Sequence, residues 1–138
     1  MNEDSQEIVI LVVDDDFQVT TFIRRALEPD LTHSILVAGN GNEAWKIADN
    51  LPALEVLIVE VDLVGGMSGI ELCKRVRQRH PSVKVLFVSG GGISQVAACP
   101  ASPVLRKPFS AEELSALVRE AAGGKDGTAK NETGNAAA

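Results

Sequence analysis

Residues 56–60 read VLIVE, four aliphatic residues followed by a carboxylate. A continuous apolar run of this length is typical of a parallel strand covered on both faces, because a strand with one face in water alternates apolar and polar residues. Similar runs recur along the chain, with helical patterns between them, at Ile8–Val13, Ser34–Ala38, Val56–Val59, Lys84–Val88 and Val104–Leu105. This alternation predicts a doubly wound α/β fold with five parallel strands and right-handed crossovers.

Length and composition indicate one folded domain. The chain has 138 residues, of which 45% are apolar, and its net charge is −6. The acidic balance argues against binding to nucleic acids or to anionic membranes, since both require surplus Lys and Arg. We expect a disordered N-terminus at 1–7, a domain at 8–122 and a disordered tail or linker at 123–138, where no large apolar residue occurs.

The cellular setting and the helix pattern are also predictable. The chain has no apolar run long enough to span a membrane and no secretory signal at MNEDSQE, so we expect a cytoplasmic protein in which Cys73 and Cys99 are reduced thiols. The segment at 90–103, GGGISQVAACPASP, has Pro100 and Pro103 near its end and favours a shortened fourth helix.

Polar side chains follow the predicted strands. Parallel α/β sheets bind ligands beyond the carboxyl ends of their strands, so these side chains converge at one edge. Clustered carboxylates suit a hard cation such as Mg²⁺, and a hydroxyl and an ammonium suit a phosphoryl group. The side chains are Asp14, Asp15, Glu60, Asp62, Ser89 and Lys107.

Three blocks resemble the receiver domain of two-component response regulators. They are ILVVDDD at 10–16, the stretch GIELCKRVRQRHPSVKVLFVSG at 69–90, and RKPF at 106–109. The resemblance implies a flavodoxin-like fold with strand order 2-1-3-4-5 and no enzyme activity beyond self-phosphorylation. It matches Asp14 and Asp15 to the acidic metal-binding pair, Ser89 to the switch hydroxyl and Lys107 to the phosphoryl-binding lysine.

The chain departs from this pattern at the phosphoacceptor. Counting back from GGMSG at 65–69, the position of the phosphorylated aspartate is Glu60. One hypothesis is that Glu60 still accepts a phosphoryl group, and another is that Asp62 takes over. Each displaces the reacting oxygen, which is costly in rate. We favour a pseudo-receiver, in which the longer carboxylate reaches Lys107 and Ser89 and replaces part of the aspartyl phosphate.

Two further interpretations stay open from the sequence. Glu60 and Lys107 would also form a purely structural ion pair. A different class of function is dinucleotide binding, because Gly39-x-Gly41-x-x-Ala44 follows a strand and opens a helix.

For the receiver interpretation we expect Mg²⁺ bound through Asp14, Asp15 and Glu60. The expected partners are a sensor kinase or an output protein, with a homodimer as a further assembly.

Overall fold

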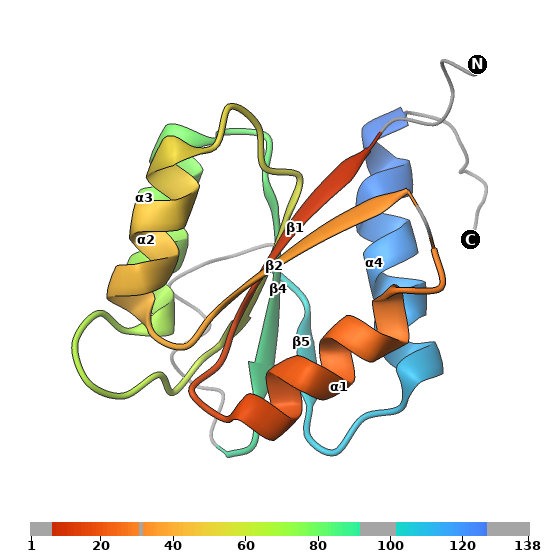
Figure 1. Ribbon diagram of the computed structural model, residues 1–138, viewed down its shortest axis with the longest axis horizontal. Coiled ribbons are helices and arrows are strands. Elements are labelled where there is room, and N and C mark those ends of the chain that lie inside the picture. The colour runs from red at the N-terminus through yellow and green to blue at the C-terminus, as the bar shows by residue number, and fades with distance from the viewer. Residues whose placement is uncertain (1–6, 31, 92–101, 127–138) are drawn as a thin grey trace.

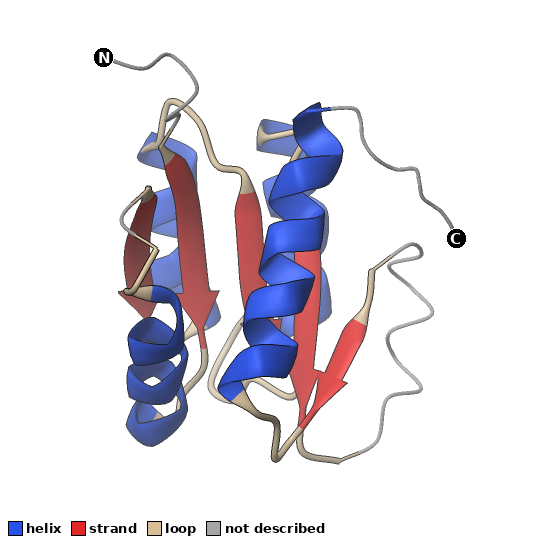
Figure 2. Ribbon diagram, turned by 90° about the vertical axis from the view of Figure 1, so that its right-hand side faces the viewer, coloured by secondary structure: helices blue, strands red, loops and turns tan. Residues whose placement is uncertain are grey.

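The computed structural model describes residues 7–30, 32–91 and 102–126. Five parallel strands form one sheet, as the apolar runs predict, in the order β2-β1-β3-β4-β5 that the family resemblance implies. Figure 2 shows the strands running in one direction, so their carboxyl ends lie together at one end of the sheet. The strands are β1 (Ile8–Val13), β2 (His33–Ala38), β3 (Val56–Glu60), β4 (Lys84–Ser89) and β5 (Val104–Arg106).

Helices cover both faces of the sheet. In Figure 1, α2 and α3 lie on one side of the sheet, and α1 and α4 lie on the other. The strands between them bury side chains on both faces: in β1, Leu11 joins the core under α2 and α3, whereas Val12 joins the core under α1 and α4. This explains the continuous apolar runs. The helices are α1 (Phe17–Leu27), α2 (Gly41–Asn50), α3 (Gly69–Arg79) and α4 (Ala111–Asp126).

Polar side chains fix the helix starts. Ser110 and Glu113 form a reciprocal capping box, because each side chain accepts a hydrogen bond from the other's main-chain N–H at 3.0 and 2.9 Å. The hydroxyl of Ser68 accepts the N–H of Glu71 at 3.0 Å at the start of α3. These caps set where α3 and α4 begin, and therefore how the preceding loops leave the carboxyl ends of β3 and β5.

Several element boundaries differ from the expectation. Glu60 and Ser89 are the last residues of β3 and β4 rather than the residues after them. The helix α4 continues to Asp126, past the expected domain boundary at residue 122. The shortened fourth helix expected near 90–103 falls mostly on residues 92–101, which lie outside the described residues.

Candidate functional site

A lysine and two carboxylates meet at the carboxyl end of the sheet. The Nζ atom of Lys107 lies 2.6 Å from Oε1 of Glu60 and 3.0 Å from Oδ2 of Asp14. Asp14 is only 3% exposed and Glu60 only 5%, whereas a quarter of the Lys107 side chain reaches solvent. One ammonium group is thus shared by two buried carboxylates at the ends of neighbouring strands and offsets one of their two negative charges.

Glu60 is held at both of its oxygens. While Oε1 contacts Lys107, Oε2 accepts a hydrogen bond from the main-chain N–H of Asp62 at 2.9 Å. Behind the strand end, a Cβ at Gly69 would clash with the main-chain oxygen of Glu60, so only glycine lets α3 start this close to β3. The carboxylate therefore has a fixed position within the site.

The main chain also holds the other charged groups. Asp14 follows β1, and its Oδ1 accepts the N–H of Asp16 at 2.9 Å. Lys107 follows β5, and its N–H donates to the carbonyl of Ser89 at 2.8 Å, which sets the lysine beside the end of β4. The lysine therefore approaches Glu60 and Asp14 from the neighbouring edge of the sheet.

The buried hydroxyl of Ser89 belongs to a turn at the end of β4. Its Oγ accepts the N–H of Gly91 at 3.2 Å and lies 3.3 Å from the carbonyl of Gly91, to which it donates. Ser89 is 1% exposed. The structure therefore places this hydroxyl at the predicted end of the sheet and bonds it to the following loop.

Asp15 and Asp62 differ from Asp14 and Glu60 in their surroundings. Both are exposed. The Oδ2 atom of Asp62 would lie 3.9 Å from a Cβ placed on Gly91, so this carboxylate faces the turn after β4. The structure thus separates the predicted acidic residues into a buried pair bound to Lys107 and an exposed pair at the rim.

Burial and pairing perturb two of the charged groups. Burial raises the pKa of Asp14, although its hydrogen bonds from Asp16 and Lys107 oppose the rise. Burial alone would lower the pKa of Lys107, but its bonds to Glu60 and Asp14 outweigh that effect and raise it above 10.5. The lysine is therefore firmly protonated at neutral pH.

The donor set does not fit a metal site in this conformation. Within residues 7–30, 32–91 and 102–126, no group of three or more His, Cys, Asp or Glu side chains is arranged to hold a metal ion. The ammonium of Lys107 already lies between Asp14 and Glu60. The predicted set of Asp14, Asp15 and Glu60 is therefore not brought together as three ligands.

The glycine-rich start of α2 is explained by packing and capping. A Cβ on Gly41 would lie 2.6 Å from the main-chain oxygen of Met67. The side chain of Asn40 accepts the N–H of Glu43 at 2.8 Å, and the Glu43 carboxylate accepts the N–H of Gly39 at 2.9 Å. A carboxylate at this helix start repels a pyrophosphate, so the geometry disfavours dinucleotide binding.

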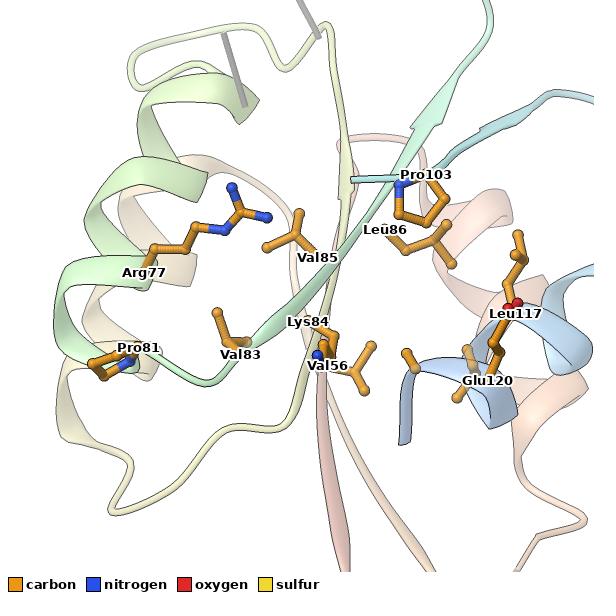
Figure 3. A pocket seen from close by; sticks show the side chains of 12 residues that line it. Val56, Arg77, Pro81, Val83, Lys84, Val85, Leu86, Pro103, Leu117 and Glu120 are labelled. Carbon is orange, nitrogen blue, oxygen red and sulfur yellow. The ribbon is translucent and has the colours of Figure 1, made fainter. Parts of the chain in front are cut away.

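A separate cavity lies at the opposite end of the sheet. Its volume is about 510 Å³, and it wraps the amino-terminal half of β4, where β5 is too short to cover the strand (Figure 3). Val83 and Val85 line it on the α3 side, and Leu86 and Val118 line it on the α4 side. None of the predicted site residues borders it, so this cavity plays no part in the acidic site.

Sequence reasoning missed how main-chain groups position the site. Nothing in the residue pattern indicates that the N–H of Asp62 binds Glu60 or that Gly69 packs against the main chain of Glu60. It also missed that Asp14 shares Lys107 with Glu60. The turn signal Gly65-Gly66, where both residues adopt positive φ, is the one local hint that the chain folds back at this point.

Comparisons with known proteins agree on one family. Residues 10–119 match the family model of the response regulator receiver domain. The chain is 31% identical over 113 residues to the transcriptional regulatory protein CpxR of Escherichia coli, a match that covers 80% of this chain and 47% of CpxR. It is 33% identical over 122 residues to the DNA-binding transcriptional regulator NtrC of Salmonella typhimurium, covering 84% of this chain and 25% of NtrC. The chain therefore spans less than half the length of these relatives.

Solved structures give the same picture. A response regulator receiver domain protein from Clostridium thermocellum aligns with a TM-score of 0.76 at 26% identity, covering 86% of this chain and 97% of that protein. The chemotaxis protein CheY4 of Vibrio cholerae shares the fold, with a TM-score of 0.73 at 24% identity over 83% of this chain and 98% of CheY4. No helix in the described part of the chain has the length and apolar character needed to cross a membrane.

Proposed function

The chain belongs to the family of response regulator receiver domains, and on that premise we propose that it is a pseudo-receiver. Receiver domains act in two-component signalling through sensor kinases and output domains. In this chain, we infer, Glu60 replaces the phosphorylated aspartate and Lys107 holds it, so that contacts with other proteins depend on one resting arrangement of the site. The partners are a sensor kinase or an output protein.

One observation carries the proposal: both oxygens of Glu60 are engaged. Oε1 lies 2.6 Å from the ammonium of Lys107, and Oε2 accepts the N–H of Asp62 at 2.9 Å. A carboxylate that attacks a phosphodonor must present an oxygen to the phosphorus in line with the leaving group. The paired carboxylate of Glu60 is therefore not free to attack a phosphodonor.

Magnesium fits the same account. Receiver domains typically bind Mg²⁺ at the phosphorylation site. Here the ammonium of Lys107 contacts both Asp14 and Glu60 and offsets one of their two negative charges, which lowers the gain from a second cation. We propose that Mg²⁺ binds weakly to the wild type, and that shortening Glu60 restores part of its affinity.

The alternative acceptor is Asp62. Its exposed carboxylate lies near the turn after β4 and is open to a small phosphodonor. However, it is not held by Lys107 in the way that Glu60 and Asp14 are. A transferred phosphoryl group would therefore lack the main cationic contact of the site.

The test is intact mass after incubation with Mg²⁺ and acetyl phosphate, for wild type, Glu60→Asp and Glu60→Asp combined with Lys107→Met. We expect only Glu60→Asp to gain a phosphoryl group, because the shorter side chain frees an oxygen while Lys107 still binds the phosphate. If wild type is modified, the pseudo-receiver proposal is wrong, and Asp62→Asn then shows whether Asp62 or Glu60 carries the group.

A further inference from the structure

The strand β2 forms an unprotected edge of the sheet. It is the terminal strand on its side, is six residues long, and is half-buried along His33–Val37. Its sequence, HSILVA, contains no Lys, Arg, Asp, Glu or Pro. Soluble proteins usually protect such an edge with a charge, a proline, a bulge or a short strand. At the other edge, β5 has only three residues and carries Arg106.

The hydrogen-bond register shows which main-chain groups of β2 point outward. The N–H of Ile8 donates to Thr32, and the N–H of Asp14 donates to Ala38. Alternation along a parallel pair then turns residues 32, 34, 36 and 38 toward β1 and turns His33, Ile35 and Val37 away from it. The N–H of His33 donates to Asp30. The outward groups left for a partner strand are therefore those of Ile35 and Val37.

These groups are complementary to those of a second copy. In an antiparallel pair centred on Leu36, Ile35 faces Val37 of the other copy, and each such pair exchanges two N–H···O=C bonds. The two-fold axis makes both pairs at once, so all four outward donors are used. We propose that the chain forms a homodimer in which two β2 strands pair in this way and join the two sheets into one.

The net charge limits where two copies can meet, and the uncharged strand β2 is one such place. Each chain carries a net charge of −6, so two copies repel over most of their surfaces. The strand β2 has no charged residue to oppose its own copy. Arg24 contacts this edge, but its Nη2 lies 3.5 Å from the carbonyl of Ile35, a long bond that leaves one lone pair of that oxygen free.

The surface beside the strand extends the proposed interface. A groove of about 540 Å³ lies between α1 and β2, bordered by Thr21, Arg25, Glu28 and Val37 and by Phe17, which is 80% exposed. A two-fold axis perpendicular to the sheet places the α1 helices of both copies on the same face and antiparallel, an arrangement that their dipoles favour. Together, the strand and the groove would bury more surface area than strand pairing alone, and a specific interface needs a large buried area.

Amide hydrogen exchange tests the register directly. In the monomer, the N–H groups of Ile35 and Val37 are open to water, whereas those of Ser34 and Leu36 are bonded to β1. Raising the protein concentration should slow exchange at Ile35 and Val37 roughly tenfold or more and leave Ser34 and Leu36 unchanged. A chain that stays monomeric at millimolar concentration overturns the proposal, and so does a dimer without this alternating protection.

A matched pair of variants tests the same interface by light scattering after size exclusion. Val37→Pro removes an outward donor without removing a bond to β1, and proline is tolerated at such edge positions. Val37→Thr keeps the N–H and the branched shape. We expect Val37→Pro to be monomeric and Val37→Thr to be dimeric at equal concentration. Equal dimerisation of two folded variants refutes the proposal; if Val37→Pro does not fold, hydrogen exchange on the wild type decides.

Discussion

Replacing Lys107 by methionine removes the only cation that the structure places between Asp14 and Glu60 in its described residues. Both carboxylates remain in place at 3% and 5% exposure, with two negative charges and no counter-charge. Stranding a buried charge in this way costs about 3–5 kcal/mol. Because a quarter of the Lys107 side chain is in solvent, which screens the ion pairs, we expect Lys107→Met to lower the free energy of unfolding by about 3 kcal/mol at neutral pH.

Removing the other end of the pair should cost less. Glu60→Gln leaves Asp14 bound to Lys107 at 3.0 Å, so no charge is stranded. The amide has one acceptor oxygen where the carboxylate has two, and either Lys107 or the N–H of Asp62 loses a bond. We expect Glu60→Gln to lower the free energy of unfolding by about 1–2 kcal/mol. In the double variant, Lys107→Met strands one carboxylate instead of two, and the two changes should couple by about 1–3 kcal/mol.

Urea unfolding, followed by circular dichroism and by the fluorescence of Trp45, the single tryptophan, measures these differences. The pH dependence adds a second criterion. The folded pKa of Lys107 is raised, so its stabilising contribution is full below 10.5 and is lost as pH rises through the folded value. Wild type and Lys107→Met should therefore converge at alkaline pH. A Glu60→Gln variant less stable than Lys107→Met would refute the reasoning, because it would mean that Lys107→Met leaves no costly buried charge behind.

Two further changes test neighbouring parts of the site. The pKa of Asp14 is raised above 3.8, mainly by burial, so protonation of Asp14 stabilises the fold below pH 3.8 and this contribution is lost as pH rises through the folded pKa. Asp14→Asn should therefore raise the urea midpoint at neutral pH but not in acid. A lower midpoint at neutral pH would contradict this. Gly69→Ala forces a Cβ against the main-chain oxygen of Glu60 and should cost about 1–3 kcal/mol. Its control, Gly123→Ala in α4, has open space around it and should be neutral or stabilising in the same urea assay.

The sheet could be predicted from the sequence because its strands are buried on both faces. A run such as VLIVE is typical of a strand buried on both faces, and the alternation of runs with helical segments predicts a doubly wound fold. The strand order itself came from the resemblance to receiver domains. The side chains of α1 were harder to place. Phe22 fits the apolar stripe of this helix but is 43% exposed and packs edge-on against Phe109 at 5.7 Å, whereas Thr20 is buried. Helical periodicity predicts the direction in which a side chain points, but not whether a neighbouring loop covers that side chain.

The site was predictable as a set of residues but not as a set of contacts. Strand ends bring Asp14, Glu60, Ser89 and Lys107 to one edge, and this follows from parallel topology alone. The sequence suggested that Glu60 reaches Lys107, but no residue pattern encodes that Asp14 shares this lysine or that the N–H groups of Asp16 and Asp62 hold the two carboxylates. The helix α4 also continues through Gly123 and Gly124, which are poor helix formers that a preceding packed helix can nevertheless extend.

If the chain is the pseudo-receiver that we propose, the contacts of Glu60 account for one resting arrangement of the site. The main chain holds both carboxylates: Asp14 by the N–H of Asp16, and Glu60 by the N–H of Asp62. Lys107 then bridges the two, with its Nζ 2.6 Å from Glu60 and 3.0 Å from Asp14. A switch needs two arrangements that differ by only a few kcal/mol, so that a ligand or a modification can exchange them. Because breaking this bridge strands buried charge, at a cost of about 3 kcal/mol, the ion pair of the proposed pseudo-receiver should bias the site toward one arrangement.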